Sequence, residues 1–194
     1  MSFRKLLMSI ALLGVGIGLV SGSMDSAYKN LEIKEKKGTT MYVAFRINIP
    51  YAIQYVENQL NGFKKKLETA EKGKKALQVK ITNYSVTLNL MKKNKIKRIC
   101  VFGDFNGWMT FASEKPNVLK PGTANPDTWY TPNAVPFLVS GAGEKLRYKF
   151  VLDIGKTYIA ADGKEQEFIY LEDPKNTSKS DDGFGGFNSE FLSK

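Results

Sequence analysis

Residues 99–108 read Ile99-Cys100-Val101-Phe102-Gly103-Asp104-Phe105-Asn106-Gly107-Trp108. The first four are apolar, which predicts a buried strand, and the glycines that follow allow the positive φ angles of a tight turn. The turn therefore holds the large, flat indole of Trp108 near the surface at a strand end. An aromatic ring fixed in this way is a platform for a ligand with an apolar face, and pyranose sugars have such faces.

The composition of the 194-residue chain excludes several kinds of chemistry. It contains no histidine, which removes the commonest metal ligand, the commonest general base and every Ser-His or Cys-His nucleophile pair. A single cysteine rules out an intrachain disulfide and a thiolate metal cluster. This residue, Cys100, lies in an apolar strand pattern, so we interpret it as a small buried hydrophobe and not as a reactive thiol. We expect no cofactor and no bound metal.

Residues 1–22 are typical of an export signal. Arg4 and Lys5 precede an apolar run from Leu6 to Val20, and Val20-Ser21-Gly22 would serve as a cleavage site. The run is shorter than the ~20 residues that span a bilayer. We therefore expect a periplasmic or secreted protein. The alternative is an uncleaved anchor, and only in that case do we expect contact with a membrane.

The net charge of +10 is unevenly distributed along the chain. Residues 23–99 carry 17 basic and 6 acidic side chains, with lysine clusters at 64–66, 74–75 and 92–93. These lysines are not interleaved with aromatic residues that could stack on bases. The pattern therefore favours a solvated helix face, or attraction to anionic envelope surfaces, over nucleic acid as a partner.

Two regions are expected after the signal. Residues 23–75 predict an accessory segment with one half-buried strand, in which Met41, Val43, Phe45, Ile47 and Ile49 alternate with polar residues. Pro50 suits the first turn of an amphipathic helix, and a basic linker ends the segment at residues 72–75. Apolar residues recur in that helix at a spacing of three to four: Tyr51, Tyr55, Val56, Leu60, Phe63 and Leu67.

Residues 76–194 predict a mainly β region of immunoglobulin-like sandwich architecture. In the run 146–153, Tyr148 and Phe150 share one face and Lys149 lies on the other, so we expect Lys149 to be exposed. The tail, residues 178–194, carries three phenylalanines and is expected to pack. The candidate strands are residues 77–90 (one strand, or two broken near Asn83), 96–102, 135–139, 146–153, 157–160 and 166–171.

Residues 101–108 resemble the signature of the glycogen-binding class of carbohydrate-binding modules. These modules occur at the amino ends of isoamylases and branching enzymes and in the β subunit of AMP-activated protein kinase. The resemblance covers roughly residues 84–191 and implies an early-set, immunoglobulin-like β-sandwich. Three further blocks resemble the family in the same order: Asp127-Thr128-Trp129, residues 147–153, and Asp173-Pro174 followed by residues 181–189.

The resemblance implies a non-catalytic module on which an α-glucan lies across a shallow surface. Trp108 matches the first sugar-stacking aromatic, Lys149 the lysine and Asn188 the asparagine that bind the hydroxyls. Each residue also has a purely structural alternative: Trp108 as a core tryptophan, Lys149 as a solvated lysine and Asn188 as a turn residue. Trp129 is interpreted mainly as a core residue.

The sequence departs from the family pattern between Asp153 and Asp173. An insert with Asp162-Gly163 at its centre predicts an extra hairpin there and contains no tryptophan. By its spacing to Asp173, Tyr170 takes the second aromatic position, with Tyr158 as its competitor. Each lost ring contact weakens binding by about 1–2 kcal/mol, so retention of sugar binding is an open question.

The sequence argues against a catalytic function. An α-glucan hydrolase needs two carboxylates set in a deep cleft. Asp181 and Asp182 are adjacent in a turn and point apart, so we interpret them as turn or cap residues. The hypotheses are an exported α-glucan-binding module or, as the alternative, an envelope protein whose sandwich has lost sugar binding and contacts a protein partner through the basic segment or residues 154–172. A third, weaker hypothesis is a subunit that targets a separate enzyme to glucan.

Overall fold

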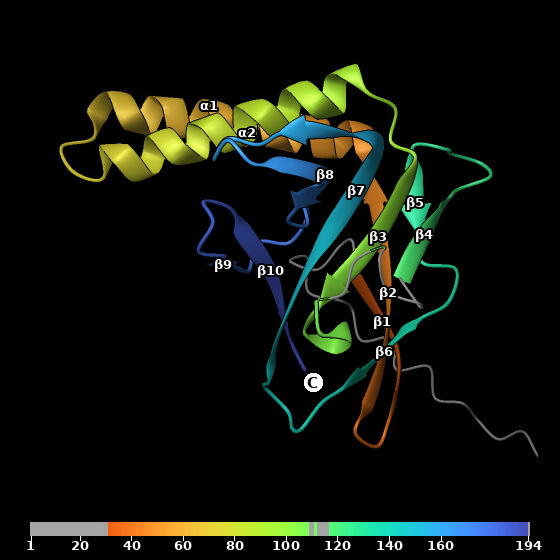
Figure 1. Ribbon diagram of the computed structural model, residues 1–194. Coiled ribbons are helices and arrows are strands. Elements are labelled where there is room, and N and C mark those ends of the chain that lie inside the picture. Colours follow the sequence, from red (N-terminus) through yellow and green to blue (C-terminus); the bar gives the residue numbers. More distant parts are fainter. Residues whose placement is uncertain (1–30, 109–110, 112–116, 194) are drawn as a thin grey trace, which may run out of the picture.

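The computed structural model describes residues 31–108, 111 and 117–193, and this part of the chain is mainly β with two long helices (Figure 1). The expected signal segment, residues 1–22, lies outside the described residues. The elements follow in the order β1 (Leu31–Lys37), β2 (Thr40–Asn48), α1 (Ile49–Thr69), α2 (Lys74–Lys93), β3 (Arg98–Gly103), the 3-10 turn η1 (Asp104–Asn106), β4 (Asn117–Pro121), β5 (Thr128–Tyr130), β6 (Val135–Leu138), β7 (Lys145–Ile159), β8 (Glu165–Leu171), β9 (Lys179–Asp181) and β10 (Phe187–Leu192).

The described strands form one curled sheet in which every pairing is antiparallel. Its order is β1-β2-β5-β4-β3-β7-β10-β9, with β6 also pairing with β2 and β8 with β7. The long strand β7 is shared between three partners. Its first residues pair with β10, its middle with β3 and its second half with β8.

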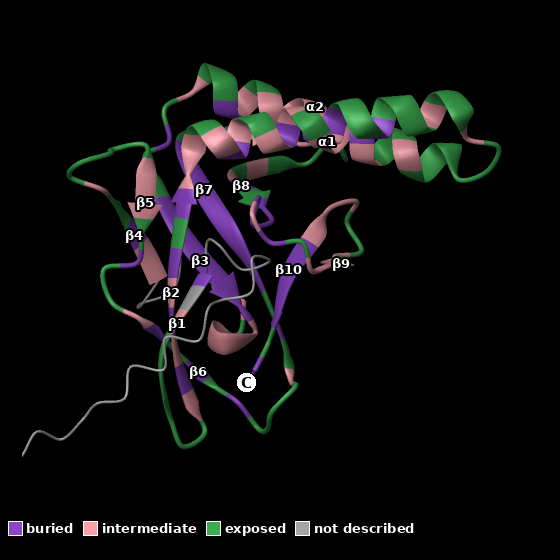
Figure 2. Ribbon diagram, turned by 180° about the vertical axis from the view of Figure 1, so that it is seen from behind, coloured by how far each residue is buried: buried purple, intermediate pink, exposed green. Residues whose placement is uncertain are grey.

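The main core lies inside the curl of the sheet. Met41, Val43, Phe45 and Ile47 of β2 are buried, which confirms the predicted alternation of that strand. Across the core, the Phe45 ring lies 5.0 Å from the Tyr148 ring of β7, between ring centroids. Figure 2 shows the buried residues concentrated along the strands that face this core, β3, β7 and β10 among them.

Helix α1 confirms the predicted amphipathic helix. The Tyr51 N–H donates to Asn48 Oδ1 at 3.0 Å and Pro50 occupies the first turn, so both start signals are used. The helix continues through Gly62 and ends at Thr69. Its buried face consists of Ala52, Val56, Leu60 and Phe63.

Helix α2 corrects the prediction that residues 77–90 form one or two strands. The β-branched residues of this segment favour a strand by local propensity. Its larger apolar residues, however, recur at alternating spacings of four and three, which is the period of a helix face that packs on α1. The ring centroids of Phe63 and Tyr84 lie 5.2 Å apart at this contact. The face comprises Leu77, Ile81, Tyr84, Leu88 and Met91.

Other expectations are met more closely. Residues 154–172 belong to the β7–β8 hairpin, with Gly163 at a φ of +80° in its turn, as the insert predicted. The tail packs as β9 and β10, with Phe191 buried and Phe187 half-buried. The two expected regions, by contrast, share secondary structure. The expected boundary between residues 75 and 76 lies inside α2, and β2 of the first region pairs with β5 and β6 of the second.

Candidate functional site

The turn after β3 depends on close backbone packing. A Cβ at Gly103 would lie 2.1 Å from the carbonyl oxygen of Arg147 on β7, so glycine is required there. The Gly103 N–H donates to Asn106 Oδ1 at 3.0 Å, and the Trp108 N–H donates to the Gly103 carbonyl at 3.0 Å. Trp108 has a φ of 62°, a left-handed conformation that costs a non-glycine residue about 1–2 kcal/mol. The turn thus holds Trp108 in a strained backbone state, a common mark of functional sites.

The Asp104 carboxylate fixes the orientation of the Trp108 indole. Trp108 Nε1 donates to Asp104 Oδ1 at 3.0 Å, and the Arg147 backbone N–H donates to Oδ2 at 2.8 Å. The Arg147 guanidinium donates to both oxygens, Nε at 3.2 Å and Nη2 at 3.1 Å. Burial alone would raise the pKa of Asp104, but the hydrogen bonds from Arg147 and Trp108 outweigh it and leave the pKa lowered. Asp104 is therefore a charged anchor for the ring.

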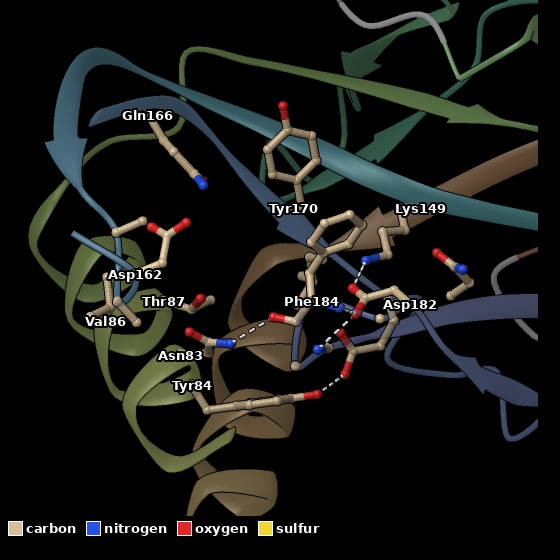
Figure 3. Close-up of a pocket in the computed structure, with 18 of the residues that line it drawn as sticks. Asn83, Tyr84, Val86, Thr87, Lys149, Asp162, Gln166, Tyr170, Asp182 and Phe184 are labelled. Atoms are coloured by element: carbon tan, nitrogen blue, oxygen red, sulfur yellow. Dashed lines mark hydrogen bonds and ion pairs between the residues drawn. The ribbon is translucent and has the colours of Figure 1, made fainter. Parts of the chain in front are cut away.

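A cleft of about 810 Å³ opens beside this turn. Its walls come from helix α2, from β3 and Trp108 in the turn that follows it, from the outer face of β7 with the β7–β8 hairpin, and from β10 with the turn that precedes it. All four residues that the sequence nominated, Trp108, Lys149, Tyr170 and Asn188, line it. Figure 3 shows Lys149, Tyr170 and Phe184 reaching this cavity from different elements. The structure thus brings together residues from segments far apart in the chain.

The aromatic floor of the cleft lies on the outer face of the sheet. Phe102, Cys100 and Val151 form a second, smaller cluster on that face, with Trp108 packed against it. The Phe102 ring centroid lies 5.1 Å from that of Trp108 and 5.7 Å from that of Tyr170. Trp108 is half-buried and Tyr170 is 43% exposed, so both rings rest on Phe102 with part of their surface open.

Two other aromatic residues are placed as follows. Tyr158, the competitor for the second aromatic position, also lines the cleft, but its hydroxyl donates to the Phe168 carbonyl at 2.8 Å. Its burial raises the pKa of its hydroxyl to about 12. Trp129 is half-buried against the main core and does not line the cleft.

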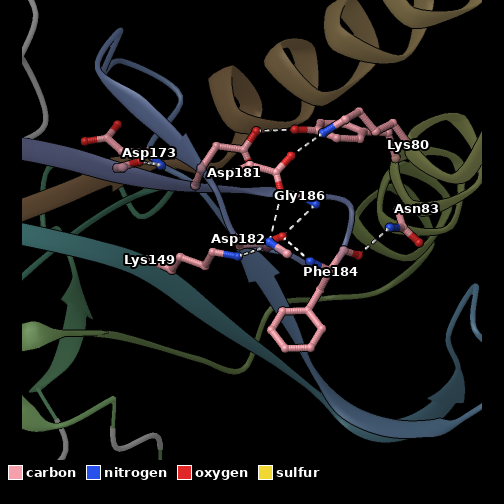
Figure 4. Close-up of polar contacts among 12 residues, drawn as sticks. Lys80, Asn83, Lys149, Asp173, Asp181, Asp182, Phe184 and Gly186 are labelled. Atoms are coloured by element: carbon pink, nitrogen blue, oxygen red, sulfur yellow. Dashed lines mark hydrogen bonds and ion pairs between the residues drawn. The ribbon is translucent and has the colours of Figure 1, made fainter. Parts of the chain in front are cut away.

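The expectation that Lys149 is exposed is wrong, because only 8% of the surface of this residue is exposed. The alternation along β7 does place it opposite the main core. That outer face is covered in turn by the segment between β9 and β10, whose Asp182 forms an ion pair with the Lys149 ammonium (Figure 4). Burial would raise the pKa of Asp182, but hydrogen bonding to Lys149 outweighs it and lowers the pKa.

Asn188 is buried, with 8% of its surface exposed at the cleft. Among the described residues its side-chain amide has no hydrogen-bond partner. Ser180 lies directly opposite on β9, so the two side chains share a face of the sheet. The Ser180 Oγ is likewise buried without a partner in the described part of the chain. Buried polar groups are rarely left unpaired, so the Asn188 amide, which lines the cleft, offers a donor and an acceptor to a ligand.

The sequence interpretation missed Phe184, which it expected to pack with the tail. Its side chain is 87% exposed on the turn between β9 and β10 and lines the cleft. The turn is rigid: Asp182 Oδ1 accepts from the N–H groups of Phe184 at 2.8 Å and Gly186 at 3.0 Å, and Asn83 Nδ2 of α2 donates to the Phe184 carbonyl at 3.2 Å (Figure 4). The Asp-Asp-Gly-Phe-Gly-Gly turn signal could have placed Phe184 at a loop tip. The expected cap role of Asp182 is confirmed.

The α2 wall was also missed, because residues 77–90 were interpreted as strand. Val79, Asn83 and Thr87 of α2 line the cleft, and Figure 3 shows Asn83 and Thr87 on its helical side. The same helix contributes Tyr84, whose hydroxyl contacts the buried carboxylate of Glu172. Burial and the nearby Glu172 raise the pKa of Tyr84, so its hydroxyl stays protonated and acts as a donor.

The carboxylates of the cleft are held by neighbours. Glu172 also accepts from the Tyr55 hydroxyl of α1 at 2.9 Å, and Asp182 is paired with Lys149. Asp162 is exposed in the hairpin turn, where it accepts from the Lys164 N–H at 3.1 Å. Within the described residues there is no group of histidine, cysteine and acidic side chains that could hold a metal ion. The cleft therefore offers aromatic faces, amides, one buried ammonium and the half-exposed guanidinium of Arg147.

Comparison with known proteins adds no assignment: no family model matches the chain, and neither a curated protein nor a solved structure does. Of the helices in the described ranges, none combines the length and the apolar character that crossing a membrane requires.

Proposed function

We propose that the cleft binds a short stretch of α-glucan without transforming it. The observation that carries the proposal is the convergence of Trp108, Lys149, Tyr170 and Asn188 on one cavity. These residues were selected on a resemblance alone, from four separate segments of the chain. The curl of the sheet, which brings β2 and β7 face to face at Phe45 and Tyr148, supports a variant of the early-set sandwich.

The chemistry of the lining supports a neutral sugar as ligand. Tyr170, Phe184 and Trp108 offer flat surfaces of the kind on which the apolar face of a pyranose stacks. The unpaired Asn188 amide offers both a donor and an acceptor to neighbouring hydroxyls. Lys149 keeps its ammonium in the ion pair with Asp182, and its remaining N–H groups are donors to the same ligand.

The shape of the site supports a short segment of glucan and not a long run across a flat face. A volume of about 810 Å³ falls within the range of about 300–1,000 Å³ of pockets that enclose small ligands. Helix α2 and the β7–β8 hairpin supply walls on either side of the aromatic floor. We therefore expect linear malto-oligosaccharides to bind as tightly per site as amylose.

The proposed module is non-catalytic. Hydrolysis of a glycosidic bond requires one carboxyl group as acid and a second as base or nucleophile. Glu172 is occupied by two tyrosine hydroxyls, and Asp182 by Lys149 and the turn N–H groups. We propose that the chain is exported and acts on its own or beside an enzyme that it brings to glucan.

The test is calorimetric titration with maltoheptaose, with cellohexaose as the negative control. Tyr170→Ala should weaken binding about tenfold, the loss expected for one ring contact of 1–2 kcal/mol. Tyr130→Ala is the matched control, because Tyr130 is a tyrosine of similar exposure, 41%, outside the cleft lining. Absence of maltoheptaose binding by the wild type would overturn the proposal and favour the protein-interaction alternative, as would equal losses in the two variants.

A further inference from the structure

The loop end of the α1–α2 hairpin is a dense cluster of lysines that the cleft does not use. Residues 64–75 contain six lysines and two glutamates. We call this segment the basic tip; its lysines are Lys64, Lys65, Lys66, Lys72, Lys74 and Lys75. All six are exposed, and none forms a salt bridge with another described residue.

The helices concentrate this charge in a small volume. Lys64 lies five residues before the end of α1, so the rise of about 1.5 Å per residue places it about 8 Å from that end. Lys74 and Lys75 form the first turn of α2 on the other side of the loop. All six lysines thus lie within twelve consecutive residues at one end of the helical hairpin. A partner that binds the basic tip therefore contacts several of these lysines at once.

The tip also projects from the body of the molecule. Figures 1 and 2 both show the loop between α1 and α2 at the free end of the hairpin, beyond the edge of the sheet. A convex, protruding end suits an extended flat surface better than a strand that has to be enclosed in a groove. The tip carries lysines without interleaved aromatic residues, which argues against a single-stranded nucleic acid that stacks its bases.

We propose that the basic tip docks the protein on an anionic lipid surface. Juxtamembrane basic residues gain roughly 1 kcal/mol each near an anionic bilayer, which is about fivefold per lysine. With a net charge of four positive units, the tip should favour anionic over neutral vesicles by a factor on the order of 10² to 10³. The docked hairpin would hold the cleft, whose α2 wall begins at Val79, close to the membrane surface.

The test is co-sedimentation of the full chain with vesicles of phosphatidylcholine, alone or with phosphatidylglycerol. The tip variant, Lys64→Gln, Lys65→Gln, Lys72→Gln and Lys74→Gln, removes the net charge of the tip and should lower the ratio of anionic to neutral binding by a factor on the order of 10² to 10³. A matched variant removes four exposed lysines elsewhere that have no salt bridge among the described residues: Lys93→Gln, Lys95→Gln, Lys120→Gln and Lys156→Gln.

The matched variant should keep most of the preference for anionic vesicles. Residues 6–20 are identical in all three proteins, so any binding by that apolar run cancels in the comparison. Equal losses in the two variants would assign the effect to overall charge and overturn the proposal. A wild-type ratio near one would also overturn it, as would displacement from vesicles by equimolar heparin, which would point to a soluble polyanion. Circular dichroism should show the same helix content in all three.

Discussion

Replacing Asp104 by asparagine removes one charge and leaves the shape of the side chain unchanged. The carboxylate accepts four hydrogen bonds, one from the Trp108 indole and three from Arg147. Hydrogen bonds to a charged group contribute about 1.5–3 kcal/mol each when buried. The Arg147 side chain is about half exposed, so solvent screening limits the ion-pair part to at most about 1 kcal/mol. The amide oxygen retains some of the bonds, and we expect Asp104→Asn to lower the free energy of unfolding by about 2 kcal/mol at pH 7.

The loss should depend on pH, because the folded-state pKa of Asp104 lies below its unfolded value near 4. A lowered pKa stabilises the fold above the unfolded-state pKa, and this stabilisation disappears as the pH falls through the folded-state value. Urea unfolding followed by tryptophan fluorescence at pH 7 and at pH 3 measures the difference. Asp127→Asn, an exposed carboxylate with no side-chain hydrogen bond among the described residues, is the control. Equal destabilisation by the two variants, or a pH-independent loss at Asp104, would refute the reasoning.

Three further outcomes are expected. Gly103→Ala should destabilise the fold by about 3 kcal/mol in urea unfolding, because the new Cβ meets backbone, whereas Gly141→Ala, which has open space, should be near neutral. Cys100 is buried and the pKa of its thiol is raised to about 12 by burial, so Ellman's reagent should react with it at pH 8 in denaturant and not in the native state. Asn188→Leu should leave the melting temperature unchanged or raise it while weakening maltoheptaose binding at least tenfold; a clear fall in stability would instead assign Asn188 a structural role.

The sequence predicted the fold best where the spacing of the apolar residues and the local propensities indicated the same element. The strand of Met41 to Ile47 and the helix after Pro50 show clean alternation and clean helical spacing, and both exist as expected. Residues 77–90 carry two conflicting signals, β-branched composition and a helical spacing of apolar residues. Packing on α1 favours the helix. This tertiary contact cannot be predicted from local propensity.

The sequence nominated residues that line one cleft, but it did not predict the shape of that cleft. The resemblance to glycogen-binding modules nominated Trp108, Lys149, Tyr170 and Asn188, and all four line one cleft. The alternation along β7 predicts on which face of the sheet Lys149 lies. It does not predict whether another segment covers that face, and so Lys149 was expected to be exposed. Phe184 was expected to pack with the tail because it is hydrophobic, whereas backbone hydrogen bonds to Asp182 and Asn83 hold its turn away from the core.

The pairing pattern of the sheet has a consequence for the order in which the chain folds. Met41 lies opposite Phe137, and Tyr148 lies opposite Ser189, so these strands pair across long sequence separations. The two helices, in contrast, are neighbours joined by a short loop and can pair within microseconds. High contact order slows folding, so the helical hairpin should form before β6 pairs with β2 and before β10 pairs with β7. Because β10 carries Asn188, the wall of the cleft that this residue forms is completed only when β10 pairs with β7.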